Sequence, residues 1–68
     1  MLNIIYHVSS QGWSGFHEME VEGQFSAVLD RAKTLALTVP AFTLGQILAH
    51  DGRVLATVGQ QGSVHIPR

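Results

Sequence analysis

The chain has 68 residues, no cysteine and a formal net charge of −1 at pH 7. This length allows one domain with one small core, and the absence of cysteine excludes disulfide bridges and cysteine-based metal sites. With only four basic residues, the surface offers no positive field for phosphates, so we expect no nucleic-acid partner.

Charged residues make up 13% of the chain, against roughly 25% in an average soluble domain. Neutral and apolar groups must therefore cover more of the surface, which favours self-association. The segment 1–10 lacks the features of a signal peptide. The uncharged stretch 34–49 is shorter than the roughly 20 residues of a membrane span. We expect a cytoplasmic protein with no membrane partner.

Two strands are expected before the first helix. Residues 2–8 are β-branched and aromatic and predict a strand with Ile5 and His7 on one face. Residues 9–15 are rich in serine and glycine and predict a loop that carries Trp13. Residues 16–22 alternate and predict a strand with one apolar face. Its other face carries Glu18, Glu20 and Glu22, either as a solvated face or as a docking stripe for a basic partner.

Residues 24–37 predict an amphipathic helix. Its apolar positions recur at helical spacing, and they are Phe25, Val28, Leu29, Ala32, Leu35 and Ala36. Gly23 is the expected N-cap, and Pro40 ends the helix because proline restricts the residue before it. Such a helix needs another element on which to bury its apolar face.

A second hairpin is expected at Asp51-Gly52, the pair favoured in a two-residue type I′ turn. That turn pairs Leu48 with Leu55 and Ala49 with Val54. Small apolar residues then share the face that suits a covering helix, namely Gly45, Ile47, Ala49, Val54, Ala56 and Val58. Leu44, Leu48 and Leu55 share the opposite face, so this sheet is apolar on both sides.

The elements sum to an α+β fold, β-β-α-β-β, with one helix packed on one face of a four-stranded, mainly antiparallel sheet. An all-antiparallel sheet allows the spatial orders 2-1-3-4 and 1-2-4-3. We expect a single domain over residues 1–59 and a flexible C-terminal tail over 60–68. Residues 63–66 are a candidate for a short edge strand.

No catalytic, cofactor or metal site is predicted. The four histidines have neither helical i, i+4 spacing nor a carboxylate at a motif distance. No serine, histidine and acid combine in a recognisable triad, and a domain of this size has little room for a deep cleft. We therefore expect a protein that is not an enzyme.

The segments DRAKTLAL and LAHDGRVLATV resemble stand-alone bacterial β-β-α-β-β domains of unknown function. The matching positions are Ala32 and Ala36 on the helix and Asp51, Gly52 and Arg53 at the turn. A looser likeness is to antitoxin domains of the HicB type, which place a Gly-aromatic strand before such a helix. Neither resemblance implies a catalytic residue.

These observations favour a small interaction module that acts as a homodimer. The interface candidates are Ile5, Leu44, Leu48, Leu55 and Trp13. Trp13 is either an interface anchor or a lid on the core, and the tail could instead cover the apolar face through Val64 and Ile66. The alternatives are an antitoxin-like or regulatory domain that needs a second protein, and a small enzyme or ligand-binding protein whose site lies between protomers.

Overall fold

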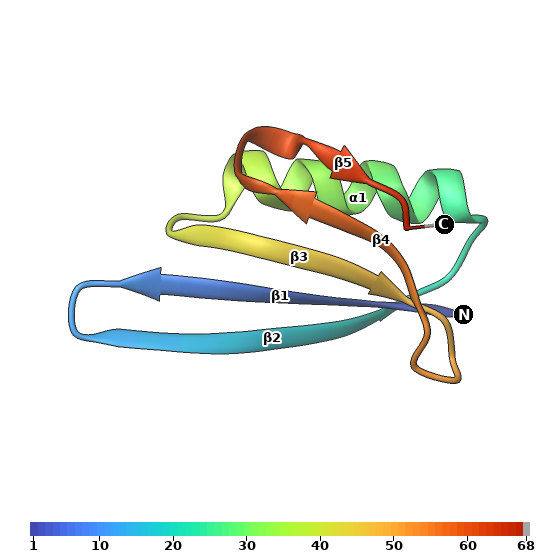
Figure 1. Ribbon diagram of the computed structural model, residues 1–68, viewed down its shortest axis with the longest axis horizontal. Coiled ribbons are helices and arrows are strands. Elements are labelled where there is room, and N and C mark those ends of the chain that lie inside the picture. Colours follow the sequence, from blue (N-terminus) through green and yellow to red (C-terminus); the bar gives the residue numbers. More distant parts are fainter. Residues whose placement is uncertain (68) are drawn as a thin grey trace.

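The computed structural model describes residues 1–67 and shows a small α+β fold with one α-helix on one face of an antiparallel sheet (Figure 1). The sheet is five-stranded, in the order β2-β1-β3-β4-β5. The elements along the chain are β1 (Leu2–Ser10), β2 (Trp13–Val21), α1 (Phe25–Thr38), β3 (Phe42–Leu48), β4 (Val54–Gly59), the 3-10 turn η1 (Gln60–Gly62) and β5 (Val64–His65). Of the two strand orders open to the sequence, the structure has 2-1-3-4, extended by β5.

The first hairpin is longer than the sequence predicts. β1 and β2 pair without a register shift from Leu2↔Val21 to Ser10↔Trp13, and only Gln11 and Gly12 lie between them. Gly12 has φ +84°, a conformation that glycine adopts without steric cost. The predicted loop over 9–15 is therefore mostly strand, because a tight turn lets its serines and glycine continue the ladder.

The helix follows prediction to within one residue at each end. Its N-cap is Gln24 rather than Gly23, and the Gln24 side chain makes no capping hydrogen bond. At the other end the backbone N–H of Val39 donates to the carbonyl of Leu35, and Pro40 follows. The helix packs on β3 and β4 and on η1.

The core lies between the helix and the sheet. Its buried residues are Ile4, Val28, Ala32, Ile47, Ala56 and Val58. The ring of Phe42 lies over Gly45, where an added Cβ would be 3.0 Å from the ring. The sequence placed Gly45 beneath the helix, but the close contact comes from an aromatic residue of the same strand.

The second hairpin differs from the predicted two-residue turn. The N–H of Gly52 donates to the carbonyl of Ala49, and the N–H of Ala49 donates to the carbonyl of Arg53. The loop thus contains three residues and ends in a glycine bulge, with Gly52 at φ +91°. The predicted type I′ turn also requires positive φ at Gly52, but the pairing next to the turn is shifted by one residue from the predicted register.

A second irregularity restores the predicted register. Pairing passes from Leu48↔Val54 to Ile47↔Ala56, so that Leu55 is an extra residue in β4. Beyond it, the pairs that the sequence predicts are present. Leu55 packs against the core, whereas Val54 shares a face with Leu48 on the side away from the helix. Val54 and Leu55 therefore each lie on the face opposite to the predicted one, because one bulge precedes Val54 at the turn and a second bulge occurs at Leu55.

The tail contributes the strand that makes the sheet five-stranded rather than four-stranded. β5 pairs with β4 through Val58↔Val64 and Thr57↔His65. Val64 thus lies on the helix side of the sheet, and Ile66 lies near Phe25 at one end of the core. The tail extends the sheet edge and does not cover the opposite face. Arg68, also assigned to the tail, lies outside the described residues.

Candidate functional site

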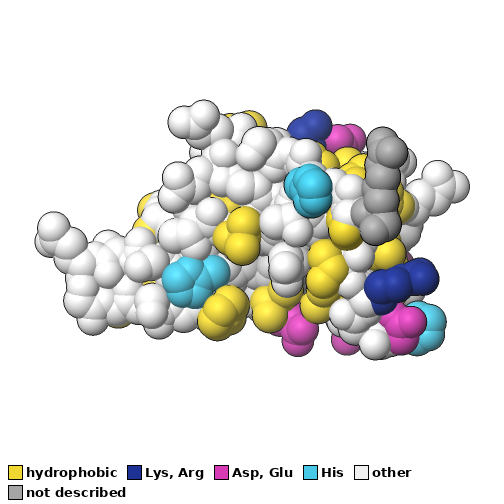
Figure 2. All heavy atoms as spheres, viewed as in Figure 1, with side chains coloured by type: hydrophobic (Ala, Val, Ile, Leu, Met, Phe, Trp, Pro, Cys, Tyr) yellow, Lys and Arg dark blue, Asp and Glu magenta, His cyan; other side chains and the backbone are white. Residues whose placement is uncertain are grey.

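The sheet face opposite the helix, here called the open face, is the first candidate site. The strand register places residues of four strands on it, namely Asn3, Ile5 and His7, then Phe16, Glu18 and Glu20, then Leu44, Gln46 and Leu48, and finally Val54 and Thr57. Figure 2 shows hydrophobic side chains gathered in patches on one face of the molecule, with histidine among them.

Five apolar residues of the open face form a group that we call the apolar patch, defined as Ile5, Phe16, Leu44, Leu48 and Val54. Ile5 stands at its centre, because Phe16, Leu44 and Leu48 occupy the diagonal cross-strand positions around it. Diagonal neighbours are about 7–8 Å apart, within reach of long side chains. Phe16 is 71% exposed and Leu44 is 45% exposed. Such exposure is unusual for large apolar groups that lie together.

The structure brings three of the predicted interface residues together and separates the other two. Ile5, Leu44 and Leu48 lie in the apolar patch. Leu55 is on the helix side against the core, because the bulge in β4 turns it over. Trp13 begins β2 at the tip of the first hairpin and is 56% exposed, so it does not form a lid on the core.

Two residues of the apolar patch, Phe16 and Val54, were not among the predicted interface residues. Phe16 alternates with Glu18 and Glu20, so its place on the open face could have been read from the same period-2 pattern. Val54 could not have been found in this way, since its face depends on the two bulges. The signal for Phe16 was present in the sequence, and the signal for Val54 was not.

His7 is a polar residue beside the apolar patch and lies between Phe16 and Leu44 in the register. Its Nδ1 lies 2.7 Å from Thr43 Oγ1, and the Thr43 hydroxyl donates to the carbonyl of His7 at 3.0 Å. The hydroxyl has one hydrogen, so Nδ1 must be the donor in the first bond. The neutral ring is thereby fixed with Nε2 as the acceptor. Phe16 packs on this ring at 4.8 Å between centroids.

An aromatic row lies on the helix side of the first hairpin. Tyr6 stacks with His17 at 5.3 Å and with Phe42 at 5.7 Å. Figure 1 shows that the tip of this hairpin extends beyond the helix. Because Tyr6 and His17 are directly opposite each other, the row crosses the sheet from β3 to β2, with His17 exposed at its outer end.

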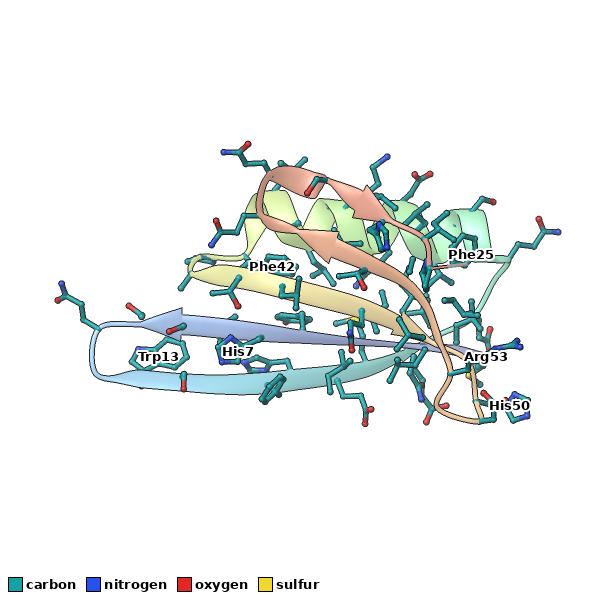
Figure 3. The ribbon with its side chains drawn as sticks, in the orientation of Figure 1. His7, Trp13, Phe25, Phe42, His50 and Arg53 are labelled. Carbon is teal, nitrogen blue, oxygen red and sulfur yellow. The ribbon has the colours of Figure 1, made fainter. Side chains whose placement is uncertain are left out.

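His7 lies far from His50 and Arg53 (Figure 3). Figure 3 shows His7 in the middle of the first hairpin and His50 and Arg53 together at the distant β3–β4 turn. In the part of the chain that the structure describes, no three His, Asp or Glu side chains are grouped so as to hold a metal ion. The N–H of Arg53 donates to Asp51 Oδ1 at 3.0 Å. This hydrogen bond lowers the pKa of the Asp51 carboxyl and stabilises the turn.

One hollow lies at the end of the core. It has a volume of about 500 Å³ and is lined by Met1, Leu2, Gly23, Phe25, Leu55 and Ile66. None of these residues has a polar side chain. Ligand sites usually combine apolar walls with a few polar groups that orient the ligand, so this hollow lacks the groups that would give it specificity.

The comparisons with known proteins leave the site to be interpreted from its geometry. No protein family, no curated protein and no solved structure matches the chain. Over the described residues, no helix has both the length and the apolar character needed to cross a membrane.

Proposed function

We propose that the protein is a non-enzymatic interaction module that forms a homodimer through the open face. The observation that supports this proposal is the apolar patch. Its residues come from four neighbouring strands, and no described segment packs over them. A two-fold axis would let the patch cover itself, and two-fold dimers are the commonest soluble oligomers.

The small core of the domain also supports this proposal. The core cluster of buried residues lies on the helix side of the sheet and leaves the open face without a covering layer in the described chain. Pairing two such faces would also enlarge the shared core of a domain whose own core is small.

Sedimentation of a dilution series tests the proposal. Wild type is expected to pass from dimer to monomer as concentration falls. Leu44→Glu should raise the dissociation constant about 30-fold or more, which corresponds to about 2 kcal/mol for a carboxylate placed in an apolar interface. Leu37→Glu is the matched control, because Leu37 is 68% exposed on the helix, away from the patch.

The control variant should dimerise as wild type does. A wild-type chain that remains monomeric at millimolar concentration would contradict the homodimer. Co-purification of a different protein whose binding Leu44→Glu abolishes would then support the antitoxin-like or regulatory alternative.

A further inference from the structure

The outer edge of β2 is a second surface, which adjoins the apolar patch at Phe16. β2 is the first strand in the sheet order, and within residues 1–67 no segment pairs with its outer side. Figure 1 shows β2 along one border of the sheet beside β1 alone. Its nine residues keep a regular register with β1 throughout.

Hydrogen bonds on the other side of β1 show which groups of β2 point outward. The N–H of Ser9 donates to the carbonyl of Ala41, and the carbonyl of His7 accepts from Thr43, both on the β3 side. Bonding direction alternates along an antiparallel strand, so the even-numbered residues of β1 bond to β2. Their partners on β2 are odd-numbered residues, whose backbone groups therefore point toward β1. The groups that point outward therefore belong to Ser14, Phe16, Glu18 and Glu20.

This edge lacks several of the features that usually prevent strand addition. β2 contains no proline, lysine or arginine and no bulge, which are among the common means of blocking an edge. Its only charges are Glu18 and Glu20, two residues apart on the open face. Their neighbours on β1 are Ile5 and Asn3, which carry no charge. The glutamates therefore lack a cross-strand partner of opposite sign.

We propose that the β2 edge binds an extended peptide in which lysine or arginine alternates with apolar residues. An added antiparallel strand would exchange backbone hydrogen bonds with Glu18 and Glu20, as in other cases of strand addition. The residues directly opposite would lie on the open face, where basic side chains pair with the two carboxylates. The intervening residues would lie beside Met19 and Val21, which are half-buried and suit apolar neighbours.

Glu18 and Glu20 also disfavour pairing of this edge with the β2 edge of a second molecule in several registers. A two-fold axis at Met19 places Glu18 opposite Glu20 of the other copy, and an axis at Glu18 places the two Glu18 residues opposite each other. Like charges directly opposite are destabilising. The site differs from the homodimer interface proposed above in that its hydrogen bonds come from the backbone of the β2 edge. It shares Phe16 with the apolar patch, and Glu18 and Glu20 lie beside that patch on the open face.

A labelled, end-blocked hexapeptide of alternating lysine and valine is the probe, with alternating glutamate and valine as its control. Fluorescence anisotropy should show at least about 10-fold tighter binding of the lysine peptide, and added salt should weaken it. Amide hydrogen exchange should slow on binding at Phe16, Glu18 and Glu20, whose N–H groups point outward. The amides of His17 and Met19, which already bond to β1, should change little.

Charge reversal supplies the second measurement. Glu18→Lys combined with Glu20→Lys should reverse the preference toward the glutamate peptide, whereas Glu22→Lys, one residue beyond β2, should preserve it. Equal binding of both peptides, or no slowing at the outward amides, would overturn the proposal. Protection of these amides without peptide that grows with protein concentration would also overturn it, since a second copy would then occupy the edge.

Discussion

His7 and the hydroxyl of Thr43 are joined by two hydrogen bonds across β1 and β3, one at the imidazole and one at the backbone carbonyl of His7. Nδ1 lies 2.7 Å from Oγ1, and Oγ1 donates to the His7 carbonyl at 3.0 Å. The pair lies where the register between these strands shifts, between His7 and Val8. The bulge thus supplies a polar residue that satisfies both the ring nitrogen and the carbonyl of His7.

Thr43→Val removes both bonds and should lower the free energy of unfolding by about 1–2 kcal/mol. It should also shift the neutral ring of His7 from the Nδ1–H tautomer toward the Nε2–H tautomer. Urea denaturation measures the first effect, and the ring ¹⁵N shifts at alkaline pH measure the second. Thr43→Ser keeps the hydroxyl and should preserve the tautomer. An unchanged tautomer in the valine variant would contradict the assigned donor.

Val28→Asp should unfold the domain. Val28 is 0% exposed between helix and sheet, and an unpaired buried carboxylate costs several kcal/mol, comparable to the roughly 5 kcal/mol stability of a small domain. Ala27→Asp places the same group on the exposed side of the same helical turn and should fold. Circular dichroism during heating separates the two. A cooperative wild-type-like transition for Val28→Asp would show that the helix packs through another face.

Gly52→Val should destabilise the β3–β4 hairpin by about 1–2 kcal/mol, because side-chain clashes disfavour the left-handed region for residues other than glycine. Gly52 has φ +91°, and a Cβ added there would meet no atom within 4 Å outside the two neighbouring residues, so the cost comes from the local backbone conformation. Gly52→Asn should cost less, since asparagine tolerates this region better. Equal unfolding midpoints for the two variants in a denaturant titration would argue against this explanation.

Asp51 should make the turn sensitive to acid. The hydrogen bond from the Arg53 N–H lowers the pKa of Asp51 in the folded state, so its stabilising effect is present above the unfolded pKa and is lost as pH falls through the folded pKa. Asp51→Asn keeps an oxygen acceptor but does not titrate. Wild type should therefore lose stability relative to this variant as the pH falls from neutral into the acid range. Parallel pH profiles from thermal denaturation would contradict the prediction.

Gln24→Asp should stabilise the protein by about 0.5–1 kcal/mol. Gln24 has the extended backbone of an N-cap, but its side chain caps no N–H group, and the first helical turn contains no acidic residue. Aspartate would accept such a hydrogen bond and interact favourably with the positive end of the helix. Gln24→Ala gives neither benefit and serves as the control. Equal unfolding midpoints for the two variants would show that the cap is already satisfied.

The sequence by itself determined the helix and four of the strands, together with the burial of the helix stripe. Val28 and Ala32 are buried as their spacing predicts, and Ile4 and Ile47 pair in the core. These features follow from local periodicity, in which each residue's face depends on its near neighbours. The open-face positions of Ile5, Leu44 and Leu48 could be predicted for the same reason.

Only the tertiary structure decided the strand order and the faces of Val54 and Leu55, whereas the sequence already indicated residues 63–66 as a candidate edge strand, which the structure forms as β5. Asp51-Gly52 is compatible with both a two-residue and a three-residue loop, and packing against the core selects the longer loop with a compensating bulge at Leu55. The partnership of His7 with Thr43 spans 36 positions in sequence, so no local pattern could indicate it. The unpaired side of β2 likewise depends on its place at the border of the sheet, because an edge is a property of the assembled sheet and not of one strand.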